Sequence, residues 1–288
     1  MMCVECRLDI ADSKGWGQML RRAHELHGVV IHARDGIVGN LDEILFDDAQ
    51  WTVRYLVVET GTWLNKKKVL LSPIAIGFSN WENNILNVNL TRTQIENSPD
   101  VETDEPVSRH WEARYHEYYG WPYYWGGPGG WGSFSFLNGT APAPASFAGV
   151  AVLDTARVDV SEGDCHLRSS KEVIGYRIAA TDGYIGHVDD FIVDDQSWRI
   201  RYIAADTRVI WPDKRVLLPL NWIESVDWPD HTVKMNISCD QIENAPEWDH
   251  HVPISAEFED SLYCYCVRQW PAAVPANEPK KDDLIPMV

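Results

Sequence analysis

The chain has 288 residues, of which 45% are hydrophobic and 24% are charged, so it is long enough for one or two globular domains. Its formal net charge of −18 disfavours binding to nucleic-acid phosphates and to anionic lipid. It has no apolar run of the roughly eighteen residues that a transmembrane helix needs. Arg7, Asp9 and Asp12 interrupt the region where a signal peptide is apolar. We therefore expect a cytoplasmic protein whose cysteines are free thiols.

Short β-strands are predicted from residue 28 onward. Residues 28–40 contain two apolar runs around Asp35-Gly36, a pair that favours a tight hairpin because glycine accepts positive φ. The strand expected at 37–46 loses its alternation at Asp42-Glu43, which predicts a β-bulge that bends a barrel wall. Asp47-Asp48 then begins a turn, and the β-branched and aromatic residues at 52–60 predict another strand.

Two more strands are predicted at 67–76 and 85–90, with Lys66-Lys67-Lys68 in solvent before them. A capping box follows at Thr91-x-x-Gln94, and Pro99 prevents the helix from continuing. This short helical segment is expected to close a small barrel, with Ile95 inserted into the core.

The same pattern occurs a second time, displaced by 147 positions. Residues 32–100 align with 179–247 without a gap, which indicates an internal duplication. The register extends upstream to Leu20-Arg21 and Leu167-Arg168. The repeated features include the pairs Asp35-Gly36 and Asp182-Gly183, the acidic pairs Asp47-Asp48 and Asp194-Asp195, and the capping boxes, the second of which is Ser238-x-x-Gln241 with Ile242 and Pro246.

The stretches 36–73, 94–108 and 118–126 resemble a known family, the PRC-barrel domain proteins. That family is named after the cytoplasmic barrel of the photosynthetic reaction centre H subunit, and a related barrel occurs in the ribosome maturation factor. The resemblance covers 19–126 and, more loosely, 167–271. It implies an all-β chain with two small barrels, and barrels of this kind serve as assembly and docking modules without a shared active site.

Each predicted barrel is followed by an aromatic-rich exit. Residues 110–120 have rings at helical spacing, which either pack on a barrel of this chain or form a patch for a partner. A Gly-, Pro- and Ala-rich stretch then predicts a linker. The expected organisation is an N-terminal extension at 1–18, a first repeat with its exit at 19–125, a linker at 126–166, a second repeat with its exit at 167–271, and a disordered tail at 272–288.

Few residues suggest chemistry. The acidic pairs are interpreted as turn residues, although paired carboxylates also suit acid–base work or cation binding. Cys3-x-x-Cys6 lacks the second pair of ligands that a structural zinc site needs. His250 and His251 are weak candidates for a metal site, together with His110 and His116 across the two repeats.

We therefore expect a non-enzymatic binding or scaffold protein in which the two barrels form an internal pseudo-dimer. No catalytic residue and no cofactor is predicted. The expected partner is a protein, and a homo-oligomer is allowed. Two alternatives stay open: a peripheral component of a photosynthetic or electron-transport membrane complex, which the H-subunit resemblance implies, and a metal-dependent hydrolase. The candidate contact residues for a partner are Trp63, Lys66, Lys67, Trp121, Trp125, Trp211 and Trp270.

Overall fold

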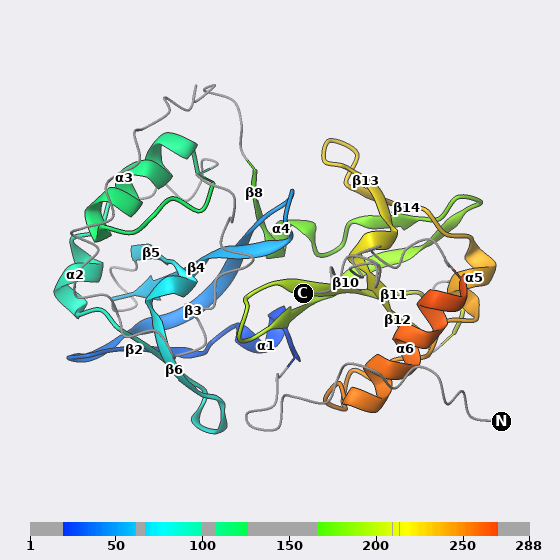
Figure 1. Ribbon diagram of the computed structural model, residues 1–288, viewed down its shortest axis with the longest axis horizontal. Coiled ribbons are helices and arrows are strands. Elements are labelled where there is room, and N and C mark those ends of the chain that lie inside the picture. The colour runs from blue at the N-terminus through cyan, green and yellow to red at the C-terminus, as the bar shows by residue number, and fades with distance from the viewer. Residues whose placement is uncertain are drawn as a thin grey trace, which may run out of the picture. The chain divides into compact units, whose positions relative to one another are not determined.

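A computed structural model describes residues 20–61, 67–99, 107–125, 166–208, 210–212 and 214–269 (Figure 1). These described residues are mostly β and form two sheets of seven strands each. It divides into two compact units. One comprises Met1–Tyr176 with Val188–Ala204, and the other Arg177–His187 with Ala205–Val288. The domain boundaries expected from the sequence stay a prediction. None of the described helices is both long enough and apolar enough to cross a membrane.

The first sheet is built from six strands of the first repeat and one strand, β8, of the second. Its path runs β5-β4-β3-β2-β7-β6, and β8 pairs with β3 beside this path. The bounds are β2 (Val30–Ala33), β3 (Gly36–Asp47), β4 (Thr52–Thr60), β5 (Lys67–Leu71), β6 (Ile76–Asn80), β7 (Ile85–Val88) and β8 (Leu167–Ser169). The helical elements of this repeat are α1 (Ala23–Leu26), α2 (Arg92–Glu96), α3 (Arg109–Tyr119) and the 3-10 turns Pro73–Ala75 and Trp81–Asn83.

The second sheet repeats this order as β12-β11-β10-β9-β14-β13, and β1 (Leu20–Arg22) pairs with β10. Its strands are β9 (Arg177–Ala179), β10 (Tyr184–Asp194), β11 (Ile200–Asp206), β12 (Arg215–Pro219), β13 (Ile223–Asp227) and β14 (Thr232–Met235). The helical elements are α4 (Ser170–Val173), α5 (Cys239–Glu243), α6 (Ala256–Gln269) and the 3-10 turn Leu220–Trp222. The unit boundary passes through β10 and β11.

The expectation of closed barrels is corrected. Among the described strands, each path is open, ending at β5 and β6 in the first sheet and at β12 and β13 in the second. The strand predicted at 67–76 is interrupted because Pro73 has a fixed φ and no amide hydrogen, and the chain makes a 3-10 turn there. The two halves of that predicted strand therefore lie at opposite ends of the path.

Several local predictions are confirmed. The register of β3 against β4 shifts between Leu41 and Glu43, so the β-bulge lies at the predicted position. Asp47 accepts hydrogen bonds from the amides of Ala49 (2.9 Å) and Gln50 (3.1 Å), as a turn aspartate does. Both capping boxes form, at Thr91 with Gln94 and at Ser238 with Gln241.

Each repeat also contributes a short arm to a long strand of the other repeat. The first arm, Leu20–Arg22, pairs antiparallel with β10, from Leu20 opposite Asp194 to Arg22 opposite Ile192. The second arm, Leu167–Ser169, pairs in the same way with β3, from Leu167 opposite Asp47 to Ser169 opposite Leu45. All of these residues belong to the first compact unit. The two arms are equivalent in the duplication, so the exchange is reciprocal.

Ion pairs and backbone hydrogen bonds follow the same two-fold pattern. Arg21 Nε donates to Asp195 (3.1 Å), and its counterpart Arg168 Nε donates to Asp48 (3.0 Å). The amide of Val53 donates to the carbonyl of Trp198, and the amide of Ile200 to that of Trp51, each over 2.8 Å. A reciprocal set of this kind is the pattern of an isologous dimer interface, here within one chain.

Acidic residues on β3 and β10 bind the arms and the helical turns that follow them, but Asp42 of the first repeat and Asp190 of the second make different contacts. Asp42 pairs with Lys171 (2.5 Å) and Lys68 (3.1 Å). Lys68, which the sequence predicts to lie in solvent, is half-buried and takes part in this ion pair. Burial acts to raise the pKa of Asp42, but the two lysines lower it below its ordinary value. Asp190 instead accepts from the backbone amides of Phe191 (2.8 Å) and His24 (3.2 Å), and burial raises its pKa to about 6.

Exchanging the charges of one reciprocal pair tests the arm exchange. Asp48→Arg or Arg168→Asp alone places like charges together, whereas the double variant restores an ion pair. We expect a coupling energy of about 1 kcal/mol between the two changes in urea unfolding, as is usual for a partly exposed pair. Combining Asp48→Arg with Arg21→Asp, which removes the partner of Asp195 instead, should give additive effects. Additivity in the first combination would contradict the pairing.

The buried Asp190 on β10 gives the free energy of unfolding a defined pH dependence. The pKa of Asp190 is raised from 3.8 to about 6, so its charge destabilises the fold above pH 6 and this cost disappears as pH falls below 3.8. Asp190→Asn should therefore stabilise the protein at pH 7, by up to about 3 kcal/mol, and make no difference near pH 3.5. Asp42→Asn is the control and should destabilise at pH 7, because the pKa of Asp42 is lowered. Urea unfolding at several pH values measures both.

Candidate functional site

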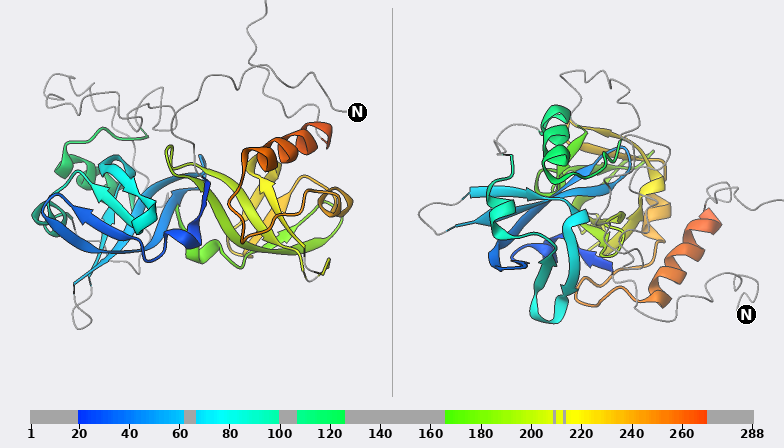
Figure 2. Two further views of the ribbon diagram at one scale, coloured as in Figure 1. Left: turned by 90° about the horizontal axis from the view of Figure 1, so that it is seen from below. Right: turned by 60° about the vertical axis from the view of Figure 1, so that its left-hand side comes forward.

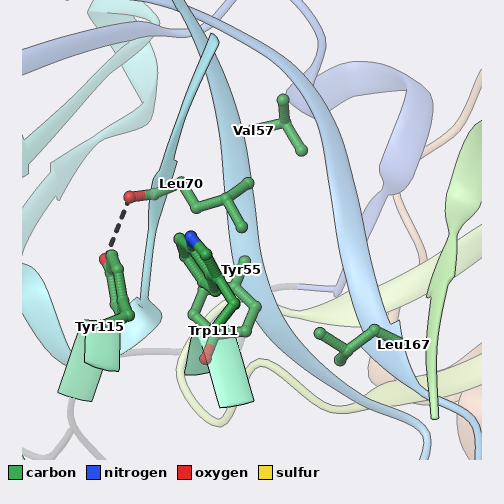
Figure 3. Close-up of a cluster of buried hydrophobic side chains, with 6 residues drawn as sticks. All are labelled: Tyr55, Val57, Leu70, Trp111, Tyr115 and Leu167. Atoms are coloured by element: carbon green, nitrogen blue, oxygen red, sulfur yellow. Dashed lines mark hydrogen bonds between the residues drawn. The ribbon is translucent and has the colours of Figure 1, made fainter. Parts of the chain in front are cut away.

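The first exit is a helix packed on its own repeat. Ser108 caps α3 by accepting from the amide of Trp111, and Gly120 ends it with a φ of 67°. The helix lies against the strands of the first sheet (Figure 2). Figure 3 shows the rings of Trp111 and Tyr115 directed at the strands, where the Tyr115 hydroxyl donates to the carbonyl of Leu70 (3.0 Å). The buried residues of this cluster are Tyr55, Val57, Leu70, Trp111, Tyr115 and Leu167, the last from the second arm.

The residues after this helix return to it. Trp121 stacks on Tyr119 with ring centroids 4.4 Å apart, and Trp125 stacks on Tyr123 at 4.9 Å. The guanidinium of Arg109 lies 4.5 Å from the Trp125 ring centroid. Trp121 and Trp125 are half-buried and in contact with rings of their own repeat, which favours the interpretation that the aromatic stripe is structural. Their contact with a partner stays a prediction.

A buried polar cluster lies beneath this aromatic layer and centres on Glu112. The Glu112 carboxylate, 2% exposed, accepts from the hydroxyls of Tyr124 (2.6 Å) and Tyr55 (3.1 Å). Arg109 pairs with its other oxygen at 3.0 Å. The Tyr55 hydroxyl also lies 3.3 Å from Nε2 of His116, whose Nδ1 lies 2.9 Å from the carbonyl of Pro122.

A second buried ion pair adjoins the cluster. The side chain of Arg54 is 1% exposed and pairs with Asp47 at 3.3 Å. Its guanidinium lies 4.0 Å from the centroid of the Tyr124 ring, which is a cation–π contact. Nε and Nη1 of Arg54 have no hydrogen-bond partner among the described residues. The face of the Tyr124 ring therefore stabilises the buried positive charge of Arg54, two of whose nitrogens have no hydrogen-bond partner among the described residues.

The protonation states in this cluster follow from burial. Burial raises the pKa of Glu112, although Tyr124 and Arg109 oppose the shift. Burial lowers the pKa of His116 to about 4, and Arg54 and Arg109 add to the effect, so the ring is neutral at pH 7. With Nδ1–H donating to Pro122, Nε2 is an acceptor that faces the Tyr55 hydroxyl. The Tyr55 hydroxyl then has one hydrogen for two acceptors, His116 and Glu112.

The cluster was not predicted from the sequence, and the second repeat does not reproduce it. The counterparts of Arg54 and Glu112 are Arg201, which is exposed, and Glu259, which is half-buried. Local patterns identified the helix and its rings, but a glutamate and a histidine within a polar, aromatic helix look like surface residues until the sheet beneath them is known.

The other candidate contact residues are spread over the repeats. Lys67 is exposed at the start of β5, and Trp211 is half-buried in a turn beside the exposed Ile210. Trp63, Lys66 and Trp270 lie outside the described residues, as do Cys3 and Cys6. The described cysteines, Cys239, Cys264 and Cys266, are free thiols, as expected.

The predicted metal candidates are only partly brought together. Ligand atoms of Asp249, His250 and His251 lie within 4.8 Å of one another. Nδ1 of His250, however, lies 2.5 Å from Nη1 of Arg215, so a guanidinium already occupies this nitrogen. His116 belongs to the Glu112 cluster and His110 is exposed on the first exit. A metal site that combines histidines of both exits stays a prediction.

Acid titration tests the neutral state of His116. Its pKa lies at about 4 in the fold against 6.5 ordinarily, so the unfolded chain takes up the proton first. Stability should therefore fall by about 3 kcal/mol as pH drops from 6.5 to 4. His116→Gln should remove this part of the acid sensitivity, whereas His110→Gln, at an exposed site, should keep it. An unchanged difference between wild type and His116→Gln across this range would contradict a buried neutral ring.

Comparison with known proteins concerns the second repeat. Residues 167–241 match the model of the PRC-barrel domain family. No curated protein matches the chain. The matched range begins at the second arm and extends through β14 to the start of α5. The chain is therefore similar to the PRC-barrel family over this range, which includes the second arm and all strands of the second repeat.

Proposed function

We propose that the chain is a non-enzymatic assembly protein built from two PRC-type repeats that act as an internal pseudo-dimer. The reciprocal arm exchange carries the proposal, since each arm completes the sheet of the other repeat. The family match in the second repeat supports a scaffold or assembly role. The first repeat has the same strand order and the same capping box, which supports a second PRC-type domain there.

The roles of the acidic residues also favour binding over catalysis. Asp47 and Asp194 each accept two turn amides, as Asp194 does from Gln196 and Ser197 at 3.0 Å. Asp48 and Asp195 pair with arginines of the arms. These four carboxylates hold turns and arms, whereas a hydrolytic role needs carboxylates that converge on a substrate.

We assign to α2 the role of closing the core of the first repeat, and to α5 the same role in the second repeat. Ile95 and Ile242 are fully buried, and each helix is anchored by its capping box. The proposed contact regions for a protein partner are the loops around Trp63, Lys66, Lys67 and Trp211 and the exits with Trp121, Trp125 and Trp270.

Site-specific photo-crosslinking in cells tests this assignment. A photoreactive residue at position 67 or 211 should give a discrete adduct with a partner protein. The same residue at Asp230, which is exposed in the turn between β13 and β14, should give none. Identical products from all three positions, or no adduct from positions 67 and 211, would contradict docking through these loops.

A further inference from the structure

The outer face of the first sheet exposes large apolar side chains. Phe78 on β6 is 61% exposed and Ile37 on β3 is 60% exposed, the highest values among the described large hydrophobic residues. Both belong to the same compact unit. Single exposed apolar residues are ordinary on a protein surface. Phe78 and Ile37 indicate a binding surface only if they lie next to each other in one apolar patch.

Strand register places them in one row. Ile37 is opposite His32, and His32 is opposite Asn87. Asn87 Nδ2 donates to the carbonyl of Phe78 (3.0 Å), which extends the row to β6. The next row on this face runs from Asn40 through Val30 and Ile85 to Asn80. The alternate residues Ile31, Ala33, Leu86 and Val88 are buried, so the two rows form the outer face.

The second repeat has the same two rows with different chemistry. Tyr184, Ala179, Lys234 and Ser225 replace Ile37, His32, Asn87 and Phe78. Arg177 and Thr232 replace Val30 and Ile85. Because this strand order accommodates a polar outer face, the fold does not require apolar residues there. Val30, Ile37, Phe78 and Ile85 therefore need another explanation.

The edge strand β6 of the first sheet is also less polar than its counterpart β13 in the second sheet. β6 (IGFSN) has no charged residue, whereas its counterpart β13 (IESVD) carries Glu224 and Asp227. Among the described strands, β6 has a partner on one side only (Figure 1). Charges on an edge strand prevent pairing with another chain, and β6 lacks this protection.

The absence of charge on this face indicates which kind of partner can bind there. Two copies of a chain with net charge −18 repel each other, so they can meet only where the surface is nearly uncharged. β2, β6 and β7 contain no acidic or basic residue apart from His32. A second copy brings an equally uncharged strand and a matching apolar face, which a basic or acidic partner would not.

We propose that the outer face around Phe78 is the docking surface for a second copy of this chain. The β6 strands pair antiparallel about a two-fold axis at Phe78, so that Ile76 of one copy is opposite Asn80 of the other. Val30, Ile37 and Ile85 continue the apolar surface beside the axis. This contact is isologous and goes beyond the proposed assembly with another protein.

Sedimentation velocity of the full chain tests the proposal. Wild type should be a dimer, and the double variant Phe78→Ser with Ile85→Thr, which takes the residues of the second repeat, should weaken the dimer tenfold or more. Tyr263→Ser is the matched control, because Tyr263 is 58% exposed on α6, and it should leave the dimer unchanged. Circular dichroism melting should show that all three proteins are folded. A wild type that stays monomeric, or a double variant as dimeric as wild type, would overturn the proposal.

A thiol at the proposed axis tests the register. Antiparallel pairing puts residue 78 of the two copies opposite each other, at the Cα separation of about 5 Å that a disulfide accepts. Phe78→Cys should form a covalent dimer on mild oxidation, to an extent well above wild type, whose own cysteines set the background. Tyr263→Cys should not exceed that background. Equal dimer yields from Phe78→Cys and wild type would overturn the pairing about Phe78.

Discussion

The exchange of arms is the constraint on which the rest of the first compact unit depends. An arm of three residues cannot be stable alone, because a short strand gains its hydrogen bonds only from a neighbour. Here the neighbour is the long strand of the other repeat, and the arm brings Leu167 into the core of the first. Burying a leucine contributes about 2 kcal/mol, comparable to the ion pair between Arg168 and Asp48 together with the new backbone hydrogen bonds.

Acidic residues on β3 and β10 help to explain why the exchange occurs at this place. The bulge in β3 bends that strand, and acidic residues on both strands accept hydrogen bonds from the arm or from the helical turn that follows it. In the first repeat Asp42 and Glu43 receive Lys171 and Ser169, and in the second Asp190 receives the amide of His24. The polar residues that interrupt the alternation therefore have two effects. They shape the strand and they recognise the other repeat.

The local features of the fold could be predicted because their causes lie within a few residues. The capping boxes, the bulge and the turn at Asp47 each depend on one side chain and a nearby amide. The arm exchange depends on pairs such as Arg168 with Asp48, 120 positions apart, and a repeat pattern does not say which copy an arm joins. The Glu112 cluster was missed for the same reason, since Tyr55 and Tyr124 meet only after the exit has folded.

Fusion of two repeats into one chain lets the copies diverge, which a homodimer of single repeats does not allow. The first exit contains a buried ionic cluster that the second exit does not reproduce, while β13 carries Glu224 and Asp227 where β6 has no charged residue. This second difference has a consequence for assembly. A chain with two uncharged edges could add copies at both ends and grow into a fibre, because each new copy would present a further edge. Only one of the edges β6 and β13 is uncharged, so pairing through β6 would be complete at two copies.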